Sequence, residues 1–244
     1  MGDMGWTNPQ HRIYLGITRQ WCRLAQLPET RLNHRIFVWA HLDAVAGRRT
    51  PLKSIISFFE SLQVNCMNSL LSIQQLALTD IDCLLRNYYH DVWTRELQRV
   101  TGRNGQGRNK LRTYRCFKSE LKPEKYLLVR MSPSERSALA RFRCGVAPIR
   151  LETGRYEGLS EDARLCPMCD LNEIESEEHV LIRCPLYAGP RSDFLTNVAA
   201  RNSDFADLTD FDKLCYILSD PDLCLATAKF CNSVIRIRSF NQYS

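Results

Sequence analysis

Residues 166–185 have the sequence CPMCDLNEIESEEHVLIRCP. Three cysteines and one histidine stand in it at the spacing C-x2-C-x9-H-x4-C, as Cys166, Cys169, His179 and Cys184. A C-x2-C pair can place two sulfurs on one ion, and zinc takes four nitrogen or sulfur ligands in a tetrahedron. Because protein atoms fill all four positions, none is left for a catalytic water. The stretch therefore predicts one structural Zn²⁺ ion.

The residues between and beside these ligands fit the same interpretation. Pro167 stiffens the turn between the first two cysteines, and Pro185 stops the chain just after the last one. Ser176 is a suitable N-cap for a short helix that presents His179 inward. The remaining cysteines have no partner at ligand spacing, and they are interpreted as core or incidental positions: Cys22, Cys66, Cys83, Cys116, Cys144, Cys215, Cys224 and Cys231.

The rest of the sequence has mostly helical periodicity. In residues 10–27 the apolar side chains share one face while Arg12, Arg19 and Arg23 share another, which predicts an amphipathic helix with a basic stripe. After Pro28 a second helix is predicted to reach about residue 46, with Leu32, Ile36, Trp39 and Ala40 directed inward. Ser132 to Glu135 form a capping box that starts another. Further helices are predicted at about 51–62, 79–100 (with Thr79 as N-cap), 110–121, 188–201, 208–218 and 221–239, and a short strand at 126–129.

The predicted fold class is mainly α: a helical body with a small CCHC zinc-binding module and a helical C-terminal tail. Four segments follow from the pattern, namely a helical body at 1–101, a basic linker with helices at 102–160, the zinc module at 161–190 and an acidic helical tail at 191–244. The chain has 244 residues, which is enough for one large domain or two small ones with a real core.

Charge is distributed unevenly along the chain. Residues 1–169 carry 26 Lys/Arg and 15 Asp/Glu, whereas residues 170–244 carry 7 and 12. A basic body suggests an anionic partner, most simply nucleic acid, and cations interleaved with aromatic rings suit a single strand. A solvated helix face with buried aromatics is the alternative. The candidate contacts are Arg103, Arg108, Lys110, Arg112, Tyr114, Arg115, Lys118, Arg141, Arg143, Arg150 and Arg155.

The sequence offers no catalytic constellation. A polymerase palm needs paired carboxylates for two metal ions, usually an adjacent Asp-Asp, and that dipeptide does not occur. The Asp-x-Asp pairs stand at predicted helix starts, where acids complement the helix dipole. The glycines at 102, 105 and 107 lack the G-K-[ST] ending of a P-loop. We therefore expect that the chain is not an enzyme.

Three stretches together carry a family resemblance: NKLRTYRCFK at 109–118, ALARFRCGVAPIRLETGRY at 138–156, and CPMC…EEHVLIRCP. They resemble the C-terminal region of metazoan non-LTR (LINE-type) retrotransposon polyproteins, which are endonuclease–reverse transcriptases. The likeness covers most of the chain and is strongest over 107–187. It implies a role in holding template RNA and target DNA beside the polymerase, with zinc ligation at the four residues above and no catalytic residue. The endonuclease and polymerase domains are missing from this chain.

Two other functions stay open at this point. The zinc module and the acidic tail could bind a protein partner, with the basic face only a solvated surface, or the chain could be a translated relic without a function. No apolar run approaches the roughly 20 residues that span a bilayer, and the N-terminus lacks the features of a signal peptide. We expect an intracellular protein with an RNA or single-stranded DNA partner and no membrane contact. The sequence does not distinguish RNA from DNA, or nucleus from cytoplasm.

Overall fold

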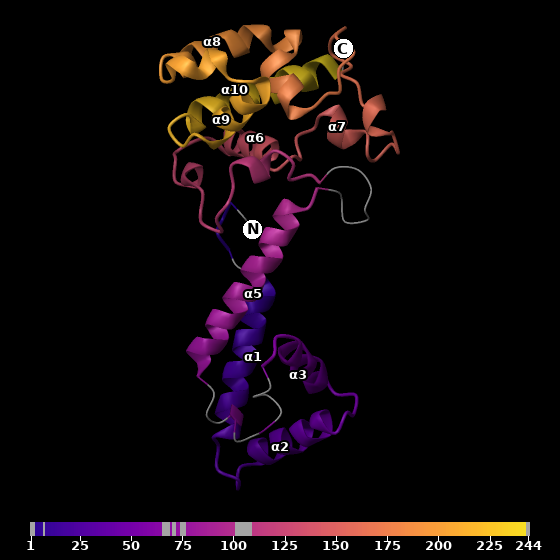
Figure 1. Cartoon of the computed structure of the whole chain (residues 1–244), viewed down its shortest axis with the longest axis vertical. Helices are drawn as coiled ribbons and strands as arrows, with labels where there is room; N and C mark the ends of the chain where they lie inside the picture. The colour runs from indigo at the N-terminus through magenta and orange to yellow at the C-terminus, as the bar shows by residue number, and fades with distance from the viewer. Residues whose placement is uncertain are drawn as a thin grey trace. The chain divides into compact units, whose positions relative to one another are not determined.

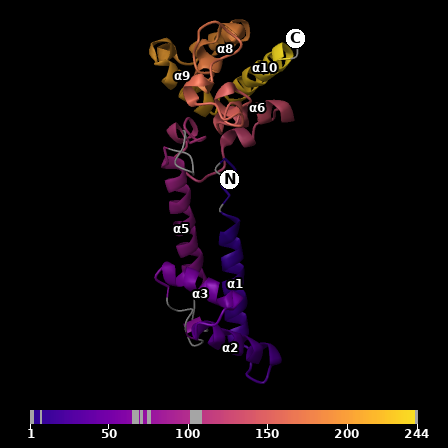
Figure 2. The same cartoon turned by 90° about the vertical axis from the view of Figure 1, so that its right-hand side faces the viewer.

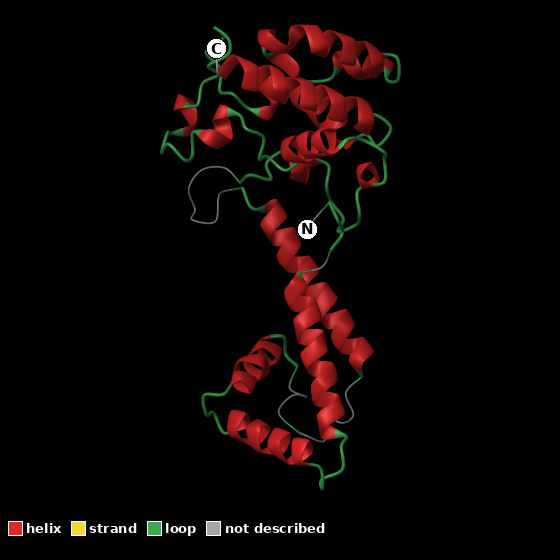
Figure 3. Cartoon of the chain, turned by 180° about the vertical axis from the view of Figure 1, so that it is seen from behind, coloured by secondary structure: helices red, strands yellow, loops and turns green. Residues whose placement is uncertain are grey.

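The chain was studied as a computed structural model, which describes residues 3–6, 8–64, 69, 72–73, 77–100 and 109–242. The fold is mainly α-helical, as predicted, and the described residues add two isolated β-bridges (Figure 3). The chain divides into two compact units. Unit 1 comprises Trp6–Trp93, and unit 2 comprises Gly2–Gly5 together with Thr94–Ser244.

Unit 1 is built from α1 (Pro9–Ala25), α2 (Leu32–Val45), α3 (Pro51–Ser61) and most of α5 (Leu78–Gln98) (Figure 1). Asn8 starts α1, because its side chain accepts a hydrogen bond from Gln10 N and Pro9 occupies the first turn. His11 Nε2 lies 2.8 Å from Asp82 Oδ1 and links α1 to α5. The core of the unit is rich in aromatic rings and contains Trp21, Phe37, Ile56, Phe59, Ile81, Leu85 and Tyr89.

Helix α2 buries a different face from the one predicted. Leu32, Ile36 and Trp39 are 67%, 52% and 66% exposed. The buried side chains are instead His34, Phe37, His41 and Ala44. Both faces carry apolar residues at helical spacing, so periodicity cannot choose between them. The contacts with α1 determine which face of α2 is buried. Phe37 packs beside Trp21 with ring centroids 6.1 Å apart, and His34 Nδ1 lies 3.0 Å from the Leu24 carbonyl oxygen.

Unit 2 is organised around α10 (Cys224–Gln242), which packs against α6 (Pro133–Arg143), α8 (Ala188–Ala199) and α9 (Asp210–Ser219) (Figure 2). The predicted capping box is present at the start of α6. A short helix, α7, spans Arg150–Thr153. Single turns complete the unit: η2 (Tyr114–Cys116), η3 (Lys125–Leu127), η4 (Glu161–Ala163), η5 (His179–Arg183), η6 (Pro185–Tyr187) and η7 (Ser203–Asp207).

Three predictions of local structure are wrong. The helix at 110–121 is replaced by turns and by η2, and the strand at 126–129 is replaced by η3. Arg136 explains the second case, because its guanidinium donates hydrogen bonds to the carbonyls of Tyr126, Leu127 and Val129 at 2.8–3.0 Å. These carbonyls therefore need no neighbouring strand. Helix α5 begins at Leu78, so Thr79 lies inside the helix and is not its N-cap.

The segment around Asp3 is part of unit 2. The Asp3 carboxylate accepts hydrogen bonds from the hydroxyls of Tyr114 and Tyr126, both at 2.7 Å, and its carbonyl accepts one from Glu124 N. Gly5 follows with φ +62°, and a Cβ there would lie 2.5 Å from Pro123. The segment around Asp3 thus belongs to unit 2, and the chain then continues through unit 1 before it returns to unit 2.

We predict that Asp3→Asn destabilises unit 2 by about 1–3 kcal/mol, because both buried tyrosine hydroxyls lose a charged acceptor and the one that faces the amide NH₂ loses its acceptor altogether. Hydrogen exchange of the backbone amides at 109–144 measures the effect. All four tryptophans, at 6, 21, 39 and 93, lie in unit 1, so tryptophan fluorescence reports unit 1 alone. The urea concentration at the midpoint of unfolding, measured by this fluorescence, should be the same in Asp3→Asn as in the wild type. Asp162→Asn, at an exposed position, is the matched control. Equal exchange in the two variants would refute the assigned role of Asp3.

Candidate metal centre

The four residues of the C-x2-C-x9-H-x4-C pattern come together in unit 2. Their ligand atoms all lie within 4.8 Å of one another, and three of the residues are buried while Cys169 is half-buried. A small loop aligns the first pair: Leu165 and Ile174 form an antiparallel bridge, and Cys166 N donates to the Glu173 carbonyl oxygen at 2.8 Å. This cluster can hold one metal ion.

The spacing of the ligand atoms fits a tetrahedral ion. Cys169 Sγ lies 3.4 Å from His179 Nε2. In a tetrahedral site with metal–sulfur and metal–nitrogen bonds of about 2.3 and 2.0 Å, these two atoms would lie about 3.5 Å apart. The donor set of three sulfurs and one imidazole nitrogen also suits a soft or borderline cation. The site would therefore be closed by protein atoms on all four corners.

Local contacts orient the histidine. Ser176 Oγ accepts a hydrogen bond from His179 N at 3.1 Å, so Ser176 caps the turn as predicted, although that turn, η5, is a π-helix. Glu173 Oε2 lies 2.8 Å from His179 Nδ1. A carboxylate only accepts, so Nδ1 carries the proton and Nε2 keeps the lone pair that a metal needs. Glu173 is a positioning residue that the sequence pattern did not reveal.

Burial changes the pKa values of two of the cysteine ligands. It raises the pKa of the Cys166 thiol and, by the same cause, the pKa of the Cys184 thiol. Backbone N–H groups of Met168 and Leu186 oppose the rise, because they favour a thiolate. Burial therefore disfavours the thiolate form of both sulfurs. A bound metal ion is the partner that would stabilise them as thiolates in a buried place.

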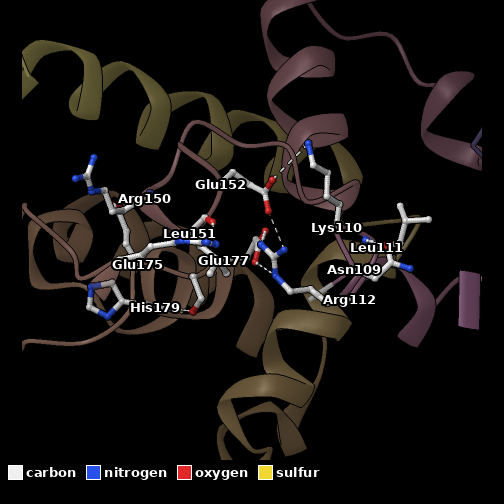
Figure 4. A network of polar contacts seen from close by, with 12 residues as sticks. Asn109, Lys110, Leu111, Arg112, Arg150, Leu151, Glu152, Glu175, Glu177 and His179 are labelled. Atoms are coloured by element: carbon white, nitrogen blue, oxygen red, sulfur yellow. Dashed lines mark hydrogen bonds and ion pairs between the residues drawn. The ribbon is translucent and has the colours of Figure 1, made fainter. Parts of the chain in front are cut away.

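Two carboxylates of the same loop extend the site into the rest of unit 2 (Figure 4). Glu177 accepts two hydrogen bonds from the Arg112 guanidinium, at 2.6 and 3.2 Å, and Glu152 accepts a third at 3.0 Å. Glu175 pairs with Arg238 of α10. All three carboxylates are buried, and the pairs made by Glu175 and Glu177 fix the loop against distant parts of the chain.

The cysteine loop also shares its hydrophobic core with the helices. Cys166, Val180, Leu181 and Cys184 belong to one continuous cluster of buried side chains. That cluster also includes residues of α6, α8, α9 and α10, namely Leu139, Phe142, Phe194, Val198, Leu214, Ile217, Ala228 and Val234. The metal ligands are therefore built into the core of unit 2.

Four of the residues predicted to contact nucleic acid are largely buried among internal partners, which corrects their expected exposure. Arg112 pairs with Glu152 and Glu177 as described, and Lys118 pairs with Glu124. Arg143 is 2% exposed and lies over the ring of Phe117 at 4.6 Å, and Tyr114 is 3% exposed. A buried ring cannot stack on a base, and a buried paired cation cannot meet a phosphate. The acidic partners lie far away in sequence and did not enter the charge pattern.

The other candidates for nucleic-acid contact differ in their exposure and in their ion pairs. Arg141 is exposed and Arg115 is half-buried, whereas Arg150 pairs with Glu157 and Arg155 pairs with Glu152. Lys110 lies 6.0 Å from the ring centroid of Tyr156, a tyrosine that is 83% exposed and that sequence reasoning missed. The glycines that bracket it, Gly154 and Gly158, are the signal that could have marked an exposed turn. Arg103 and Arg108 lie outside the described residues.

Comparison with known proteins adds no relative. No protein-family model, no curated protein and no solved structure matches this chain. Among the helices of the described residues, none has the length and apolar character needed to cross a membrane.

Glu173→Gln should weaken metal binding about 10- to 100-fold, because an amide can turn its NH₂ group toward Nδ1 and favour the wrong tautomer. Competition with a coloured chelator measures the affinity. Glu178→Gln is the matched control, since it removes the same charge from the residue next to His179 and Glu178 pairs with Arg183. Equal affinities in the two variants would mean that Glu173 does not position the ligand.

Proposed function

We propose that the metal is a single structural zinc ion and that the chain is a non-catalytic, nucleic-acid-binding part of a retrotransposon reverse transcriptase. The closed set of four convergent protein ligands is the observation that carries the metal assignment. The resemblance of residues 109–118, 138–156 and 166–185 to the region after the polymerase carries the assignment to that class of protein.

Zinc is favoured by the ligand chemistry. Three thiolates and one imidazole are a set that structural zinc sites use, and hard cations such as Mg²⁺ and Ca²⁺ prefer oxygen. Zinc also has no redox chemistry that would oxidise the thiolates. Because the ligands lie in the core of unit 2, the binding free energy would contribute directly to folding. The role of the ion is thus to hold the loop at 161–190 against the helices.

The absence of catalysis is supported by the contacts of the acidic pairs. Asp212 of the pair at 210 and 212 receives a hydrogen bond from Thr209 Oγ1 at 2.6 Å, and it sits in the first turn of α9. Asp82 binds Arg86 and His11. Asp220 accepts hydrogen bonds from Asp222 N and Leu223 N. Each of these three Asp-x-Asp pairs in the described residues therefore contains a carboxylate with a structural partner, which favours a structural role for the pairs over a site for two Mg²⁺ ions.

Nucleic-acid binding is supported by a cluster beside α7. Lys110 and Arg155 are half-buried and both pair with Glu152, and Lys110 also lies over the exposed ring of Tyr156. Such a combination suits single-stranded nucleic acid, because the cations meet phosphates and the ring stacks on a base. Arg115 and Arg141 are further candidates. Tyr156 takes the stacking role that the sequence assigned to Tyr114.

A second candidate function rests on α2. Its exposed face carries five large apolar side chains, more than a solvated helix needs, at Leu32, Ile36, Trp39, Leu42 and Val45. This face favours an interaction module that binds another protein. If folded, zinc-loaded protein binds neither RNA nor single-stranded DNA at about 50 mM salt, where electrostatic attraction is strongest, this reading becomes the better one.

Purified protein should contain about one zinc per chain. Cys184→Ser should lose the metal and open the loop at 161–190 to proteolysis, because a ligand is missing. Cys231→Ser is the matched control, as Cys231 is equally buried in the same core but lies outside the ligand cluster. Elemental analysis measures the zinc content of the wild type and of both variants. Full zinc content in Cys184→Ser, or a wild type without zinc but with intact thiols, would refute the assignment.

Tyr156→Ala should weaken binding of single-stranded RNA or DNA by about 1–3 kcal/mol without changing thermal stability, because the ring is exposed. Lys110→Glu should flatten the plot of log affinity against log salt by about 0.7, since one phosphate contact is lost. Lys122→Glu makes the same charge change at a position that is 72% exposed and paired with Glu120, and serves as control. Identical titrations of all three variants and wild type would contradict the proposed contact.

A further inference from the structure

Two cysteines that stand far apart in the sequence come together in unit 2, away from the metal centre. Cys116 ends η2 and is exposed, and Cys215 lies within α9 and is half-buried. A hydrogen bond joins the two side chains. The spacing of the cysteines along the chain gave no sign of this contact, and both residues were expected to be core or incidental positions. The fold instead makes them a pair of thiols.

A cavity of about 540 Å³ opens beside the pair. Cys116 lines it together with Arg115 and Leu214, and Leu214 directly precedes Cys215. Its volume lies in the range of small-molecule sites, roughly 300–1,000 Å³. A small disulfide such as glutathione disulfide can therefore approach Cys116 from the solvent. Arg115 offers a cation to the carboxylates that such a molecule carries.

The surroundings of Cys215 disfavour a charge on its sulfur. Burial raises the pKa of this thiol to about 12, and Cys116, Asp212 and Glu178 add to the rise. A thiolate is therefore unfavourable here, whereas a disulfide is neutral and burial does not oppose it. The exposed Cys116 is the thiol that a reagent from the solvent meets first, so Cys215 is the second to react.

We propose that Cys116 and Cys215 are a redox-active pair that glutathione disulfide oxidises to an intramolecular disulfide. The Cys116 sulfur first attacks one sulfur of glutathione disulfide, and a bond between Cys116 and glutathione forms while one glutathione leaves. The Cys215 sulfur then attacks the Cys116 sulfur and displaces the second glutathione. Each cysteine gives its proton to a departing glutathione. The two cysteines lose two electrons, and one glutathione disulfide is reduced to two thiols.

The new bond joins the two sides of the metal centre. The closed loop runs from 116 to 215 and contains all four ligands of the cluster. It also contains Glu177 and Glu178, which line the same cavity just before His179, and α9 packs against η5. A cross-link across a long loop restricts the unfolded chain. Oxidation should therefore slow the opening of unit 2, and a reducing agent should reverse the effect.

The test is incubation of the full, zinc-loaded chain with glutathione disulfide, followed by digestion and mass spectrometry without a reducing agent. The wild type should yield peptides joined through Cys116 and Cys215, with the loss of two hydrogen atoms, and dithiothreitol should separate them. Cys215→Ser should lose the cross-link and keep glutathione on Cys116, because the second step is blocked. Cys83→Ser is the matched control: Cys83 is also exposed, its side-chain contact is with Asn87, and the variant should cross-link as the wild type does.

Hydrogen exchange of the amides at 109–144 is the second readout. It should be slower in oxidised than in reduced wild type and equal in the two forms of Cys215→Ser. The inference is wrong if glutathione stays on Cys116 in the wild type as in Cys215→Ser, or if oxidation leaves exchange unchanged. Zinc released in step with the loss of the Cys116 thiol would also overturn it, since the oxidant would then be attacking the metal centre. A chain that holds no zinc should still form the cross-link, so the proposed metal and this pair can fail separately.

Discussion

A buried carboxylate needs a cation or several donors, and the cysteine loop buries two of them, Glu175 and Glu177. The acidic residues alternate along this loop. Glu173 holds the ring of His179, Glu175 pairs with Arg238 of α10, and Glu177 pairs with Arg112. Breaking one of these pairs would leave a charge unpaired in the core. These pairs therefore hold the loop against the helices in the position in which the four ligand atoms converge.

The same pairs change the meaning of the charge asymmetry. From the sequence, the basic body is predicted to bind an anionic partner, and the acidic tail could bind a protein. Some of these charges instead form ion pairs between the two stretches. Arg112 of the basic segment pairs with Glu177 of the acidic stretch. Arg143 is likewise enclosed by Glu124 and three aromatic rings. Fewer basic side chains are therefore available to a partner than the composition suggests.

Sequence was sufficient where the determining contacts are local. The ligand spacing, the Ser132 capping box and the helix starts at Pro51 and Pro133 each depend on residues close together in the sequence, and the structure contains all of them. Sequence was insufficient where the partner is remote. Arg112 meets Glu177 across 65 positions, and the buried face of α2 is chosen by Trp21 and Leu24 of another helix. Periodicity and charge counts contain no information about such contacts.

Asp3 shows how chain order constrains assembly. Its partners Tyr114 and Tyr126 lie 111 and 123 positions later. At about 5–20 residues per second, a ribosome takes roughly 6 to 25 s to make the second tyrosine after the aspartate. All of Trp6–Trp93 is synthesised within that interval. Unit 1 can therefore fold before the part of unit 2 that binds the segment around Asp3 has been synthesised. The Asp3 carboxylate must stay solvated on the nascent chain until the two tyrosine hydroxyls that donate to it emerge from the ribosome.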